Sequence, residues 1–170
     1  MKALVIYESM FGNTAAVAQA IGDGLGATMQ VELREVHDAS GELPDDVDLL
    51  VVGGPTHALS MSRPKTREEA VSQGGSVGRA DFGLRDWLSS PPDTSRGRAM
   101  VTFDTRMAKA RHFPGSAAKS AARAARKRGF SIAAPPESFY VVDTAGPLVE
   151  GEAERATDWG RVLGSLVQTP

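Results

Sequence analysis

The chain has 170 residues and a formal net charge of −2, which is long enough for one domain with its own apolar core. It contains no cysteine, so disulfides, thiolate metal sites, iron–sulfur clusters and Cys-x-x-Cys redox pairs are excluded. Any redox chemistry therefore requires a bound cofactor. We expect a single domain over residues 1–170, with no internal repeat or second domain.

The first three residues lead directly into a strand pattern, so no signal peptide is expected. No apolar run is long enough to cross a bilayer. From these two features we expect a cytoplasmic location and no membrane span.

A strand, a polar turn and a helix follow one another in the first 25 residues. Leu4 to Tyr7 form the continuous apolar run of a buried strand, and apolar residues recur at helical spacing from Val17 to Leu25. The turn holds residues that suit helix N-caps and close backbone approach, namely Ser9, Gly12, Asn13 and Thr14. A helix N-terminus of this kind is an anion site, although the same residues also suit an ordinary capped turn.

Two common nucleotide motifs are absent from this turn. No Gly-Lys-Ser/Thr follows it, and no Gly-x-Gly-x-x-Gly is present. Gly22, Gly24 and Gly26 come late in the helix pattern, where we expect them to end the helix.

The remaining elements alternate between strands and helices. Apolar patterning predicts strands over 29–36, 48–54 and 98–104, and a last strand in two parts, 130–133 and 138–143, broken at Pro135-Pro136. Helices are predicted from Thr66 onward, over 82–88, over 115–127 and from Glu152 onward. This order predicts an α/β fold, with a doubly wound, five-stranded parallel sheet and helices on both faces.

Ligands of such sheets lie beyond the carboxyl ends of the strands. Three loops leave these ends in the predicted fold: Ser9–Thr14, Pro55–Ser62 and Asp104–Pro114. We therefore expect the functional site where these loops meet.

The first stretch resembles the fingerprint of the flavodoxin family, at Val5, Ile6, Tyr7, Ser9, Gly12, Thr14, Ala18 and Ile21. This resemblance implies strand order 2-1-3-4-5 and non-covalent binding of flavin mononucleotide (FMN). It implies that the first loop holds the FMN phosphate and that the other two flank the ring. The cofactor-binding residues that it implies are Ser9, Met10, Phe11, Gly12, Asn13, Thr14, Pro55, Thr56, His57, Ala58, Phe103, Asp104, Thr105 and Arg106.

The chain departs from many flavodoxins in its ring loops, which contain no Trp or Tyr. The side chains available to contact a ring are His57, Met61, Phe103, His112 and Phe113, and Phe103 lies in a strand pattern that favours core packing. The chain also lacks the strong negative charge of many electron-carrying flavodoxins. The block from Gly53 to Ala58, with Met61 to Pro64, resembles an actinobacterial flavodoxin-like subgroup.

Charge is unevenly distributed along the chain. Residues 105–136 contain no Asp or Glu, so all 21 acidic residues lie elsewhere. The basic residues of this segment are Arg106, Lys109, Arg111, Lys119, Arg123, Arg126, Lys127 and Arg128. Part of the cluster is explained by the helix dipole, which favours cations near the carboxyl end of a helix. The rest is explained by a face that binds an acidic redox protein or a nicotinamide cofactor. No motif for nucleic-acid binding accompanies the charge.

Three functions are compatible with these residues. The first is an FMN-binding electron carrier between redox partners, for which no catalytic residues are assigned. The second is an NAD(P)H-dependent FMN quinone reductase, and the third is a flavin-free binding module with the same fold. Arg106 directly follows a strand end, where we expect it to favour full reduction of the flavin, whereas Asp104 opposes this. His37, His57 and His112 are too dispersed for a metal site, so no metal is expected.

Overall fold

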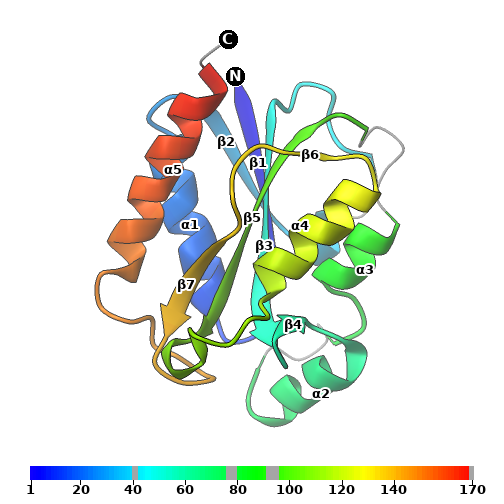
Figure 1. Cartoon of the computed structure of the whole chain (residues 1–170), viewed down its shortest axis with the longest axis vertical. Coiled ribbons are helices and arrows are strands. Elements are labelled where there is room, and N and C mark those ends of the chain that lie inside the picture. Colours follow the sequence, from blue (N-terminus) through cyan, green and yellow to red (C-terminus); the bar gives the residue numbers. More distant parts are fainter. Residues whose placement is uncertain (40–41, 76–79, 91–95, 169–170) are drawn as a thin grey trace.

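A mostly parallel β-sheet forms the centre of the computed structural model, and helices cover both of its faces (Figure 1). The structure describes residues 1–39, 42–75, 80–90 and 96–168. Its strands are β1 (Lys2–Tyr7), β2 (Gln30–Glu35), β3 (Leu49–His57), β4 (Ser60–Met61), β5 (Ala99–Met107), β6 (Ser131–Ile132) and β7 (Glu137–Val141). Its helices are α1 (Asn13–Leu25), α2 (Pro64–Ser72), α3 (Leu84–Ser89), α4 (Ala117–Lys127) and α5 (Glu152–Gln168).

The strand order confirms the predicted doubly wound sheet. The order is β2-β1-β3-β5-β6, and β7 pairs parallel to β5 further along that strand. The two parts of the predicted last strand are thus β6 and β7, on either side of the two prolines. β4 is a short addition that pairs antiparallel to the end of β3.

The core has two layers, one on each face of the sheet. Alternate residues of the central strands enter opposite layers, so that Leu4 and Ile6 face α3 and α4 while Ala3 and Val5 face α1 and α5. The buried face of α4 consists of alanines. Because alanine side chains are short, this helix can lie close to β3 and β5.

Two glycines expected to end the first helix lie inside it, so that interpretation is wrong for Gly22 and Gly24. Gly26 does cap the helix. At Gly24 an added Cβ atom would lie 2.0 Å from the carbonyl oxygen of Thr157, and at Gly160 it would lie 2.3 Å from that of Ile21. The two glycines therefore allow α1 and α5 to pack backbone against backbone.

Two element boundaries differ from the prediction, one because of a helix cap and one because of strand pairing. α2 begins at Pro64, and the hydroxyl of Thr66 accepts a hydrogen bond from the backbone N–H of Arg63 at 2.9 Å. β5 continues past Asp104 to Met107 because β7 pairs with it from Phe103 to Met107. Thr105 and Arg106 therefore lie in a strand and not in a loop.

The carboxyl ends of β1, β3, β5 and β7 meet at one edge of the sheet, far from both chain termini (Figure 1). The loops after these strands surround the candidate site described below. In the part of the chain that the structure describes, no helix is both long enough and apolar enough to cross a membrane.

Candidate functional site

The loop after β1 presents several backbone N–H groups at the start of α1. The hydroxyl of Ser9 accepts hydrogen bonds from the N–H groups of Gly12 and Ala15, each at 3.2 Å. The N–H groups of Phe11, Asn13 and Thr14 have no acceptor among the described residues. Gly12 has a φ of 90°, which other residues adopt only with strain. Free N–H groups at the positive end of a helix dipole favour an anion.

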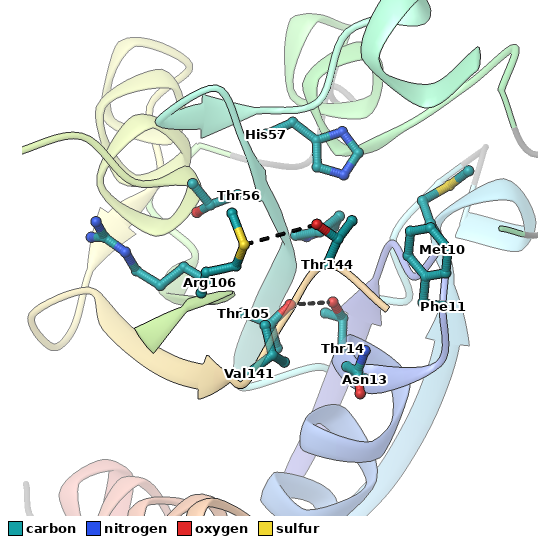
Figure 2. Close-up of a pocket in the computed structure, with 12 residues that line it drawn as sticks. Met10, Phe11, Asn13, Thr14, Thr56, His57, Thr105, Arg106, Val141 and Thr144 are labelled. Atoms are coloured by element: carbon teal, nitrogen blue, oxygen red, sulfur yellow. Dashed lines mark hydrogen bonds between the residues drawn. The ribbon is translucent and has the colours of Figure 1, made fainter. Parts of the chain in front are cut away.

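Side chains from three other strand ends meet this loop (Figure 2). The hydroxyl groups of Thr14 and Thr105 are 2.7 Å apart, and Thr144 donates a hydrogen bond to the sulfur of Met107 at 3.8 Å. A narrow groove of about 70 Å³ runs between these loops. It is lined by Met10, Phe11, Asn13, Thr14, Pro55, Thr56, His57, Thr105, Arg106, Met107, Val141 and Thr144.

A wider apolar pocket of about 510 Å³ adjoins the groove and shares Thr56, Arg106 and Met107 with it. We call it the wide pocket. Its other lining residues are Ala58, Leu59, Lys109, Ala110 and Phe113. A small polar group fits the groove, and a planar apolar group fits the wide pocket, which is of the size usual for organic ligands.

The turn between β3 and β4 forms one wall of the wide pocket. Ala58 and Leu59 both have positive φ angles, 46° and 61°, which are uncommon for residues with a Cβ atom. A Cβ atom at Gly115 would lie 2.4 Å from the carbonyl oxygen of Leu59, so this glycine lets the start of α4 approach the turn. Ser60 donates a hydrogen bond to Ser120 of α4 at 3.1 Å and fixes the same contact.

Arg106 lines both the groove and the wide pocket. It is only 4% exposed, and its Nη2 donates to the backbone carbonyl groups of Ala110 and, at 3.2 Å, Phe113. Its Nε has no hydrogen-bond partner, and no carboxylate pairs with it among the described residues. A buried cation without an anion is costly, so this guanidinium favours an anionic neighbour.

Asp104 lies two residues earlier and is fully buried. Its Oδ2 accepts hydrogen bonds from the hydroxyl of Thr56 at 3.1 Å and the N–H of Ala118 at 2.8 Å, whereas its Oδ1 has no partner. Burial raises the pKa of this carboxyl group above its usual value, and the hydrogen bond from Ala118 opposes the rise. Asp104 therefore opposes a negative charge in the site less than an exposed carboxylate would.

His57 lies at the end of β3, on the opposite side of the groove from Thr105 (Figure 2). Its Nδ1 is 3.1 Å from the hydroxyl of Thr66 in α2. Burial lowers the pKa of this imidazole, and the nearby Arg67 lowers it further. His57 is thus held in its neutral form near pH 7.

A buried network of charges connects the first loop to α2 and α3. The carboxylate of Glu8, next to Ser9, accepts hydrogen bonds from the hydroxyl of Ser62 at 2.5 Å and the N–H of Leu84 at 2.8 Å. Arg67, fully buried, donates to Ser62 at 3.0 Å and to Asp86 at 2.8 Å. These contacts hold the segment after β4 against the loop that presents the free N–H groups.

The structure brings most of the predicted site residues together, because all of them except Ser9, Gly12, Ala58, Phe103 and Asp104 line the groove. Ser9 and Gly12 are joined by a hydrogen bond within the first loop, and Ala58 lines the wide pocket. Asp104 accepts a hydrogen bond from the hydroxyl of Thr56. Phe103 is fully buried in the layer of α1 and α5.

Sequence reasoning missed the end of β7 and the loop after it, which contribute Val141 and Thr144 to the groove. The signal was present in the second half of the predicted last strand, whose carboxyl end also reaches this edge of the sheet. Gly146 allows the approach, because a Cβ atom there would lie 2.5 Å from Oδ1 of Asn13. In the described segments no cluster of three or more His, Asp and Glu side chains is arranged to hold a metal ion.

Comparisons with known proteins agree with this architecture. The family model described as flavodoxin matches residues 5–69. No curated protein matches the chain. Its fold is similar to that of a flavodoxin from the domain Archaea, with 19% identity over 99% of both chains and a TM-score of 0.64.

Two further solved structures are similar. Flavodoxin 2 from Bacillus cereus is 17% identical over 97% of this chain and 98% of its own, with a TM-score of 0.66. A flavodoxin, WrbA-like protein from Agrobacterium tumefaciens is 16% identical over 98% of this chain and 97% of its own, with a TM-score of 0.55. At these identities the neighbours establish the fold, and the function has to be argued from the site.

Proposed function

We propose that this chain, a flavodoxin-like protein, binds FMN non-covalently and transfers electrons between redox partners. The observation that carries the proposal is the set of free N–H groups at Phe11, Asn13 and Thr14, which opens on a groove that widens into an apolar pocket. A phosphate ester suits the first part, and a tricyclic ring suits the second.

At the phosphate end, this chain offers neutral donors only. The three N–H groups are candidates to bind the phosphate oxygens, and the hydroxyl groups of Thr14 and Ser9 lie beside them. Because hydrogen bonds to a charged group contribute about 1.5–3 kcal/mol each, three of them are enough to dominate binding. The phosphate therefore needs no lysine of the kind found in nucleotide-triphosphate loops.

At the ring end, the candidate contacts are aliphatic and aromatic. Leu59 and Phe113 line the wide pocket from different loops, and Thr56 and Met107 line both this pocket and the groove. Phe113 is 57% exposed in the absence of a ligand, so it is free to cover a ring. It stands in place of the Trp or Tyr that the ring loops lack.

Bound FMN supplies one- and two-electron redox chemistry, and the protein sets the charge around it. Arg106 offers a buried positive charge without a carboxylate partner, and Asp104 is biased toward its neutral form. Two opposite unit charges about 4 Å apart interact by about 4 kcal/mol at an effective dielectric constant near 20. Arg106 is therefore the residue expected to favour negative charge on a reduced ring.

A reductase that takes electrons from NAD(P)H is the second candidate. The wide pocket is open to solvent and lies beside Lys109 and Arg106, which leaves room for a phosphate-bearing donor over the ring. Anaerobic mixing with NAD(P)H alone separates the candidates. A carrier keeps its yellow colour until a protein partner is added, whereas a reductase is bleached at once.

The primary test is a titration of the protein with FMN. We expect saturable quenching of the FMN fluorescence with one site per chain. An Arg106→Ala variant should then show a lower midpoint potential for the second electron, and Arg106→Lys should keep most of the wild-type value. A chain that leaves FMN fluorescence unchanged at all concentrations would support the flavin-free binding module instead.

A further inference from the structure

Large apolar side chains surround the opening of the wide pocket. Leu59 is 41% exposed and Phe113 is 57% exposed, and both line the pocket. A single exposed apolar residue is ordinary, but exposed apolar residues on both sides of one opening are typical of a binding surface.

Basic side chains lie in the wide pocket and on the segments that adjoin its walls. Lys109 lines the pocket with 70% of its side chain exposed, and the guanidinium of Arg111 lies 4.9 Å from the ring centre of Tyr140. Lys119 is exposed in the first turn of α4, next to the serine that is bonded to Ser60. We call Leu59, Lys109, Arg111, Phe113 and Lys119 the basic rim.

Two cations of the basic rim have a carboxylate nearby among the described residues. The charge of Arg111 helps to lower the pKa of Glu152. Lys109 is 4.0 Å from Asp143, but both side chains are about 70% exposed, and such surface pairs contribute little. Lys119 has no ion pair within the described part of the chain. The contrast with other cations is clear, because Arg67, Arg155 and Arg161 each contact a carboxylate at 2.8 Å or less.

From this juxtaposition we propose that the basic rim is the docking surface for an acidic redox protein. The inference rests on the proposed function, because the rim encloses the pocket expected to hold the flavin ring. Exposed apolar side chains with cations beside them are a combination found at protein–protein interfaces. A partner with complementary negative charge would be steered to this opening, which raises the association rate and makes it dependent on salt.

The basic residues at the other end of α4 provide a matched control. Arg126 and Lys127 are exposed in its last turn, seven and eight residues along from Lys119. That spacing corresponds to about 12 Å along a helix, which exceeds the Debye length of about 8 Å at physiological salt. Reversing the charges of Lys109 and Lys119 changes the net charge of the protein as much as reversing those of Arg126 and Lys127. Only the first pair lies on the basic rim.

The test uses a plant-type [2Fe–2S] ferredoxin as the acidic probe and cytochrome c as a basic one. Binding of ferredoxin is measured by calorimetry with the FMN-free protein at physiological salt. Electron transfer from reduced ferredoxin, and from the reduced flavin to oxidised cytochrome c, is measured with the FMN-loaded protein. We expect Lys109→Glu/Lys119→Glu to weaken ferredoxin binding at least tenfold, and Arg126→Glu/Lys127→Glu to weaken it less than threefold. Transfer from reduced ferredoxin to the flavin should slow as salt rises, whereas transfer from the reduced flavin to cytochrome c should not.

Equal weakening by the two pairs would overturn the proposal, because the effect would then reflect net charge alone. So would binding to vesicles of anionic lipid or to duplex DNA without saturable binding to ferredoxin. Circular dichroism confirms that each variant is folded. Since the calorimetry needs no flavin, ferredoxin binding without FMN binding would reject the proposed function and leave the docking surface standing.

Discussion

The two ends of the candidate site are built in opposite ways. At the phosphate end, six consecutive residues, Ser9–Thr14, form one polar loop on a helix N-terminus. At the ring end, the wide pocket takes its walls from two loops about fifty residues apart, and its lining is mainly apolar. We expect the phosphate end to provide most of the affinity for FMN. We expect the ring end to set the redox potential and the choice of partner.

The largest expected effect comes from removing the phosphate from the ligand. Riboflavin has the ring of FMN but gives the free N–H groups of Phe11, Asn13 and Thr14 nothing anionic to bind. We expect it to bind about 100-fold more weakly than FMN, a difference of about 2.7 kcal/mol. Fluorescence titration with both ligands measures the ratio. Equal affinities would place the binding energy at the ring end instead.

A change in the backbone of the first loop should have the next largest effect. Gly12→Ala places a side chain at a φ of 90°, and a left-handed conformation costs such a residue about 1–2 kcal/mol. We expect a lower unfolding temperature and FMN binding about tenfold weaker. Gly151→Ala is the control, because Gly151 has a φ of 85° and equally open surroundings, but lies outside the groove and the wide pocket. It should lose stability and keep its FMN affinity.

A change at the ring end should weaken both ligands equally. Phe113→Ala removes an aromatic side chain whose contact with a ring is worth about 1 kcal/mol, so FMN and riboflavin should each bind about fivefold more weakly. Titration of the two ligands should show an unchanged ratio between them. Val142→Ala, at an equally exposed position outside the groove and the wide pocket, should leave both affinities close to wild type. A changed ratio for Phe113→Ala would mean that the two ends are coupled.

The smallest expected effect concerns Asp104, which braces the strand between the two ends. Because burial raises its pKa in the folded protein, its contribution to stability is fully present below the unfolded pKa near 4 and is lost as pH rises through the folded value. Asp104→Asn removes this dependence and keeps an acceptor for Thr56 and Ala118.

Urea unfolding of both proteins between pH 4 and pH 8 measures the difference in unfolding free energy. We expect the variant to gain stability relative to wild type as pH rises through this range. A constant difference would indicate that Asp104 has the same pKa in the folded and unfolded states.

The position of a residue in the chain explains how well its role was predicted. The strand, turn and helix at the start were predictable because contiguous residues determine them, through an apolar run, cap residues and helical spacing. The prediction that Gly24 ends the first helix is wrong, because distant residues decide its role. Its role depends on the backbone of α5, about 135 residues later, and nothing in its own surroundings indicates that contact.

The same distinction applies to charge. The sequence showed a segment without acidic residues and a cation at Arg106 after a strand, but ion pairing depends on which side chains the fold brings together. Only the structure shows that Arg106 has no carboxylate partner among the described residues, whereas Arg67 has an acidic partner in α3. It also shows that Asp104 lacks a partner for one oxygen and is fully buried.

The amino-acid sequence alone therefore determined the alternation of strands and helices and the loop that offers its N–H groups, because periodicity and local backbone preferences act over a few residues. The sheet order was expected from the resemblance to the flavodoxin family. Tertiary structure decided the width of the wide pocket, the entry of the loop after β7, and the protonation bias of Asp104 and His57. These features arise from contacts between distant segments and from burial, and no local pattern of residues specifies either.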